Sequence, residues 1–221
     1  MPHEVNRDRL RENVRFAGEA VVERLGAGLA ALERRDEELA WEVVEGGHEV
    51  AEMSLDIESE CTELAFQQST AGDRRFVAAS FGVVTALERI GALATTLGNH
   101  SLDARREVVP EVDLQEIGDA AVEMTRTAVD AYTVGESRAC FDVADRDETV
   151  DDLCESPSET VARRLLDLAP EAAEEAEVRQ LLREVRRLQT TVRTLERAGD
   201  RAVDVAAHAL YAVEGDDDLL Y

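Results

Sequence analysis

The sequence contains no lysine. All 24 basic residues are arginine, and 49 aspartates and glutamates outnumber them, which gives a formal net charge of −25. So much negative charge repels the phosphates of nucleic acids and the headgroups of anionic lipids, so it excludes direct nucleic-acid binding and electrostatic docking on a membrane. The same field attracts cations and basic partner surfaces. It is also typical of adaptation to high salt, where dissolved ions screen the repulsion.

Cysteine, aromatic residues and long apolar runs are scarce too. The three cysteines form no Cys-x-x-Cys pair, which argues against a disulfide framework or a thiolate metal site and favours a reducing compartment. The N-terminal segment is charged from Glu4 onward, and no run approaches the ~20 apolar residues of a membrane helix. We therefore expect a soluble, cytoplasmic protein that does not insert into a membrane.

The sequence also lacks the motifs of common enzymes. It has no Walker loop, no Gly-x-Ser-x-Gly and no Cys/His pair with a plausible partner. Nucleophilic catalysis and nucleotide hydrolysis therefore have no support, and we expect a protein that is not an enzyme.

What is present favours helices. Hydrophobic residues make up 44% of the chain and aromatics only 4%, so a core must be built from Leu, Val and Ala, the usual filling of helix bundles. Apolar residues recur at steps of three and four. They predict helices over about 6–33, 37–68, 73–98, 114–133, 136–168 and 181–211. Gly46-Gly47 is a weak point in the second helix, Gly98-Asn99 predicts the end of the third, and residues 99–113 are the candidate connection between two halves.

The most regular apolar stripe lies in the last helix. It runs through Leu181, Val185, Leu188, Val192, Leu195, Gly199, Ala202, Ala206 and Ala209. Beside this stripe, Glu196, Asp200 and Asp204 follow one another at i, i+4 and i+8, which places three carboxylates along one flank. Like charges at this spacing repel each other, so they are either solvated or neutralised by a cation.

A second copy of this pattern lies 108 residues earlier. Leu87-Glu88-Arg89-Ile90-Gly91 aligns with Leu195-Glu196-Arg197-Ala198-Gly199, and the residues of the second and fifth helices align at an offset of 100. The chain is therefore an internal duplication.

The repeated Leu-Glu-Arg-x-Gly resembles the PhoU family of phosphate-uptake regulators. The resemblance extends to Asp73-Arg74-Arg75-Phe76-Val77-Ala78-Ala79-Ser80 and to residues 43–55. It implies an all-α fold of two tandem three-helix bundles, at residues 6–100 and 113–213. It also implies regulation of phosphate uptake through contact with a phosphate ABC transporter and, in bacteria, its sensor kinase. A homodimer is a further possibility. In this family a Glu-x-x-x-Asp motif on the third helix of each bundle faces acids of the second, and these residues bind metal clusters.

In the second half, the residues themselves permit such a site. Asp147 and Asp151 stand at i, i+4 on the fifth helix, and antiparallel packing would bring them opposite Glu196, Asp200 and Asp204. Carboxylates suit hard or borderline divalent or trivalent cations such as iron, Mg, Mn or Ca, with Zn also open. His208 is the one imidazole that could extend the cluster. The alternative is that these acids are a solvated face in a chain with 33% charged residues.

The first half keeps little of that pattern. Gly47, Ala92 and Thr96 occupy the positions of three expected ligands, and only Glu88 remains. One carboxylate cannot hold a cluster, so we expect metal in the second bundle only.

Two other functions stay open. A carboxylate-bridged enzyme or metal store would use Glu-x-x-His motifs on separate helices, and the chain has one match, Glu45-Gly46-Gly47-His48. The other is an acidic scaffold that has no metal function.

Overall fold

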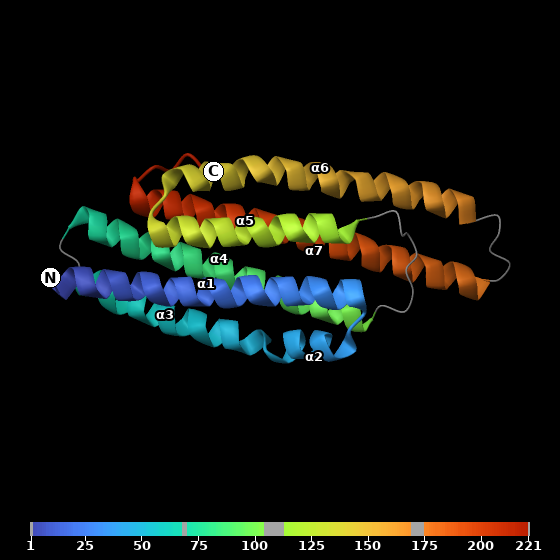
Figure 1. Ribbon diagram of the computed structural model, residues 1–221, viewed down its shortest axis with the longest axis horizontal. Helices are drawn as coiled ribbons and strands as arrows, with labels where there is room; N and C mark the ends of the chain where they lie inside the picture. Colours follow the sequence, from blue (N-terminus) through green and yellow to red (C-terminus); the bar gives the residue numbers. More distant parts are fainter. Residues whose placement is uncertain (1, 68–69, 104–112, 169–174, 221) are drawn as a thin grey trace.

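The computed structural model describes residues 2–67, 70–103, 113–168 and 175–220. Within these residues the regular structure is helical throughout, as expected, and no strand occurs (Figure 1). The helices are α1 (Pro2–Arg34), α2 (Glu37–Glu45), α3 (Gly47–Gln67), α4 (Ala71–Leu102), α5 (Leu114–Val134), α6 (Ser137–Leu168) and α7 (Glu175–Val213). Most of the expected connection between the halves, residues 104–112, lies outside the described residues.

The helices form two bundles that share one core. In the first half α1, α2 and α3 pack on α4, and in the second half α5 and α6 pack on α7. The halves meet through α4 with α7 and through α1 with α5. Figure 1 shows α6 along one edge of the molecule and α2 with α3 along the opposite edge. The predicted stripe of α7 is buried from Val185 to Ala209, with Leu188 partly buried, whereas the Leu181 side chain lies outside the described residues.

The predicted second helix is divided into α2 and α3 at Gly46. Arg24 of α1 lies against this glycine and donates hydrogen bonds to the Val43 carbonyl at 3.0 Å and to Glu49 Oε2 at 3.1 Å. A Cβ atom on Gly46 would lie 2.5 Å from Arg24 Nη1. The weak point expected in the sequence is therefore a break, and the Arg24 guanidinium binds on both sides of it.

The expected end of the third helix at Gly98 is wrong. α4 continues to Leu102, and Gly98 is buried against α2, where a Cβ would lie 3.1 Å from the Ala40 carbonyl oxygen. A small residue is required there because two helices approach closely, and not because the helix stops. By contrast, the end predicted near residue 133 is confirmed, because α5 ends at Val134 and is capped by Gly135, with a φ of +80° that favours glycine.

α4 is more apolar than the absence of long apolar runs predicts. It contains an 18-residue window of mean hydropathy 1.5, long and apolar enough by composition to cross a membrane, and 56% of that window is buried inside the protein. α4 packs on α1, α2, α3 and α7, so its apolar residues have helices as neighbours. A central position in a bundle accounts for this composition.

The duplication in the sequence is also a duplication of contacts. A Cβ on Gly91 would lie 2.9 Å from Val50 Cγ1, and one on Gly199 would lie 3.6 Å from Val150 Cγ1, the equivalent pair in the second half. Between the halves the contacts are reciprocal. Gly18 of α1 lies against Val129 of α5, while Gly118, 100 residues after Gly18, lies against Leu29, 100 residues before Val129. α1 and α5 therefore run in opposite directions about an approximate two-fold axis.

Candidate metal centre

The predicted carboxylates lie where α6 and α7 pack against each other. Gly199 is buried at this contact, and the position of a Cβ on it is 3.3 Å from Asp147 Oδ1. That oxygen is buried and has no hydrogen-bond partner. A buried carboxylate oxygen without a donor is unfavourable, so the structure leaves Asp147 in need of a proton or a cation.

The charges around Asp147 come from the residues predicted with it. Its pKa is raised to about 6, first by burial and then by the negative charges of Asp151, Asp200 and Glu196. The pKa of Asp200 is also raised, mainly by burial, although Arg201 partly opposes the shift. Four of the five predicted ligands therefore share one electrostatic environment at the α6 and α7 contact.

Asp204 has a different environment from the other four. It accepts a hydrogen bond from Arg201 Nη1 at 2.5 Å, three residues away on the same helix. Its negative charge still contributes to the raised pKa of Asp200. Asp204 thus lies at the edge of the carboxylate group, where it pairs with Arg201 and still acts on Asp200.

His208 does not extend the cluster but points to α4. Its ring lies over Gly82, where a Cβ would be 2.4 Å from Nε2. Burial lowers the pKa of His208, and the charge of Asp204 opposes this. The imidazole is therefore part of the contact between the two bundles.

No three of the predicted carboxylates have oxygens that all lie within 4.8 Å of one another. In the described part of the chain, only Asp216, Asp217 and Asp218 of the C-terminal tail bring three ligand oxygens within 4.8 Å of one another. These three are exposed or half-buried, as acids on a solvated tail commonly are. The group of Asp147, Asp151, Glu196 and Asp200 differs from the tail because it contains a buried oxygen without a hydrogen-bond partner, Asp147 Oδ1, among converging negative charges. Its carboxylate oxygens are donors that suit a hard cation.

Sequence reasoning missed one neighbour of this group. Cys154 is buried on α6, and its thiol pKa is raised to about 12 by burial and by the charges of Glu196, Asp151, Asp200 and Asp147. Its position three residues after Asp151 could have indicated this proximity. A thiol with so high a pKa stays protonated at neutral pH, so it contributes an apolar wall and no thiolate ligand.

The equivalent region of the first half is built differently. Gly47 occupies the position of Asp147, and Thr95 fills the space, since a Cβ on Gly47 would lie 2.7 Å from Thr95 Oγ1. Glu88 is exposed, whereas its counterpart Glu196 is half-buried. The two halves therefore share helix packing but not a carboxylate group.

Comparison with known proteins agrees with this architecture. The model of the PhoU domain matches the chain twice, at residues 14–100 and at residues 114–209. The chain belongs to the PhoU family. Both halves carry the domain, so the internal duplication is a tandem of PhoU domains.

Relatives in bacteria and archaea are similar over most of their length. The phosphate-specific transport system accessory protein PhoU of Serratia marcescens is 28% identical over 213 residues, 95% of this chain and 84% of that protein. A PhoU homologue of Methanothermobacter thermautotrophicus is 27% identical over 80% of this chain and 78% of its own. The crystal structure of PhoU from Pseudomonas aeruginosa superposes with a TM-score of 0.84, at 25% identity, covering 96% of this chain and 99% of that one.

Proposed function

We propose that this PhoU-family protein regulates phosphate uptake by binding a phosphate ABC transporter. The observation that carries the proposal is the match of the PhoU domain to both halves, together with relatives named as accessory proteins of the phosphate-specific transport system. The chain covers more than four fifths of these relatives, so the proposal concerns a whole regulator rather than a shared module. A sensor kinase is a second partner in cells that have one.

The charge and motifs of the chain support a role through protein contact. A net charge of −25 is unsuited to nucleic-acid phosphates and anionic lipids and suited to basic protein surfaces on the cytoplasmic side of a transporter. The Glu45 to His48 match to an enzyme motif does not lie on one continuous helix, because Glu45 ends α2 and His48 lies in the first turn of α3. The proposal therefore assigns no catalytic residue.

The metal part of the proposal concerns the second bundle. Asp147, Asp151, Glu196 and Asp200 would hold one or more cations, with Asp204 at the edge, and iron, Zn, Mg, Mn and Ca all suit oxygen donors to differing degrees. A bound cation would supply positive charge at a place where four carboxylates repel each other. The unpaired Asp147 Oδ1 is the observation that supports this assignment.

The test of the regulatory proposal is phosphate uptake by cells from which the protein has been deleted. Uptake under phosphate-replete conditions should rise, because the proposed regulator restrains the transporter, and the wild-type chain should restore it. Purified transporter should also retain the protein at the salt concentration of the native cell. Unaltered uptake in cells that hold no second PhoU protein would contradict the proposal.

A further inference from the structure

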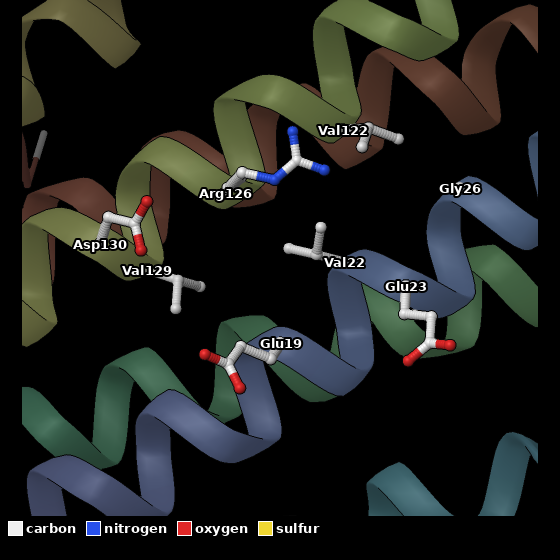
Figure 2. A pocket seen from close by; sticks show the side chains of 8 residues that line it. All are labelled: Glu19, Val22, Glu23, Gly26, Val122, Arg126, Val129 and Asp130. Atoms are coloured by element: carbon white, nitrogen blue, oxygen red, sulfur yellow. The ribbon is translucent and has the colours of Figure 1, made fainter.

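A groove of about 500 Å³ lies between α1 and α5, on the approximate two-fold axis that relates the halves. α1 contributes Glu19, Val22, Glu23 and Gly26 to it, and α5 contributes Val122, Arg126, Val129 and Asp130. Figure 2 shows the space between the two helices, with Val22 and Arg126 pointing into it. The carboxylates of Glu19 and Glu23 follow the α1 edge, and that of Asp130 lies on the α5 edge.

The hollow results from the sizes of the facing side chains. Gly18 against Val129 and Gly118 against Leu29 close the helix contact on either side of the axis. Between these contacts the helices present Val22 and its repeat equivalent Val122, which are too short to fill the gap. Gly26 deepens it, because a Cβ there would meet nothing within 4 Å. The first half thus leaves open space at Gly26, whereas the second half has Arg126 at the equivalent position.

The charges at the rim leave an acidic excess. Arg126 donates a hydrogen bond to Glu123 at 2.7 Å, and Glu19 is paired with Arg15. Glu23 and Asp130 are exposed and make no ion pair with any described residue. The groove therefore combines an apolar floor of valines with two carboxylates whose charge is uncompensated, one on each edge.

We propose that this groove is the docking site for a basic segment of a partner protein. Apolar side chains of the segment would cover Val22 and Val122, and its arginines or lysines would pair with Glu23 and Asp130. This inference rests on the proposed function and deepens it, because the phosphate transporter would supply the segment. Charge complementarity carries the choice of occupant: nucleic acid and anionic lipid are repelled, and a second copy of this chain brings a further 25 negative charges.

The test compares two double substitutions that change the net charge equally. Glu23→Arg with Asp130→Arg reverses both free carboxylates of the groove, whereas Glu33→Arg with Asp142→Arg reverses two exposed carboxylates of α1 and α6 outside it. Binding of each purified chain to the purified phosphate transporter is measured at one salt concentration. The groove variant should bind at least about tenfold more weakly and the control within about twofold of wild type. Equal weakening of both variants would overturn the docking site, since bulk charge would explain it.

A second measurement identifies the occupant without reversing any charge of the groove, so misfolding of the charge-reversal variants does not decide its outcome. The three native cysteines are buried, so Gly26→Cys offers an accessible thiol for a photoactivatable cross-linker inside the groove. The cross-linked transporter peptide should be rich in arginine or lysine, and Glu33→Cys should not label it. A cross-link to an acidic segment, or to a second copy of this chain, would overturn the inference while transporter binding by wild type would still support the proposed function. Failure of the wild-type chain to bind the transporter would instead refute the proposed function.

Discussion

Asp147 is the residue at which the structure is most clearly unsatisfied. Its carboxyl has a buried oxygen without a donor and a pKa raised to about 6 from an ordinary value of 3.8. The folded protein therefore holds a proton on this group between about pH 4 and pH 6 that the unfolded chain has released. In the metal-free protein, this contribution to the free energy of unfolding is present below about pH 4 and is lost as the pH rises through 6.

Asp147→Asn should restore the contribution to the free energy of unfolding that the metal-free wild type loses as the pH rises through 6. The amide has the shape of the carboxyl without its charge, so the metal-free variant should be more stable than metal-free wild type at pH 7 and no more stable at pH 4. Urea unfolding of chelator-treated protein at both values measures the difference. If metal-free wild type is instead more stable than the metal-free variant at pH 7, a neighbouring group already compensates the charge of Asp147.

The asymmetry between the halves predicts where metal binds. Asp200→Ala should remove most of the metal from purified protein, because it deletes one of four converging carboxylates. Glu88→Ala should leave the metal content unchanged, because Glu88 is exposed and its half has Gly47 in place of Asp147. Elemental analysis of protein purified without chelator measures both. Equal losses would place metal in both bundles, and wild-type protein that cannot be loaded would leave the carboxylates as a solvated face.

At the scale of the helices, α1 carries two glycines in opposite surroundings. A Cβ on Gly18 would lie 2.6 Å from Val129 Cγ1, whereas one on Gly26 would meet nothing within 4 Å. Gly18→Ala should lower the free energy of unfolding by about 1–3 kcal/mol through overpacking against α5. Gly26→Ala should raise it by up to about 1 kcal/mol, because alanine favours the helix and has room there. Chemical unfolding of the two variants decides this, and a loss of equal size in both would contradict the reciprocal packing of α1 and α5.

The helices themselves could be predicted from the sequence, and their contacts only in part. Apolar periodicity places α1, α5 and α7 because each has a buried stripe. The two offsets of the duplication make Gly199 equivalent to Gly91 and Val150 equivalent to Val50, and the structure shows that the glycine packs on the valine in both halves. The helix end predicted at Gly98 is wrong because Gly-Asn is a local stop signal, whereas the role of this glycine depends on which helix lies opposite. The α1 and α5 groove was not predictable for the same reason.

The candidate site, like the helix contacts, could be predicted from the sequence only in part. Spacing along α6 and α7, combined with antiparallel packing, predicts that five carboxylates converge, and the charges of three of them, Asp151, Glu196 and Asp200, act on Asp147. The pairing of Asp204 with Arg201 and the direction of His208 depend on side-chain conformations and on a third helix. Periodicity carries no information on either.

The charge of the whole molecule predicts its response to salt. About 25 uncompensated negative charges on one compact chain are screened within ~3 Å at 1 M salt but act over ~30 Å at 0.01 M. The thermal midpoint should fall steeply as salt is removed, by about 2–4 °C for each kcal/mol of added repulsion in a chain of this size. Melting curves from molar to millimolar salt measure it. A flat profile would contradict the interpretation of the acidic surface as an adaptation to high salt.

Gly18 packs on Val129 while Gly118 packs on Leu29, which is the pattern of contacts across the two-fold axis of a homodimer. A half-length ancestor that dimerised in this way would have carried each site twice, and every substitution would have changed both copies at once. Once fused into one chain, the halves mutate separately. Independent substitution within one chain allows Gly47 to differ from Asp147, and Gly26 to differ from Arg126, while the helix packing of the two halves stays equivalent.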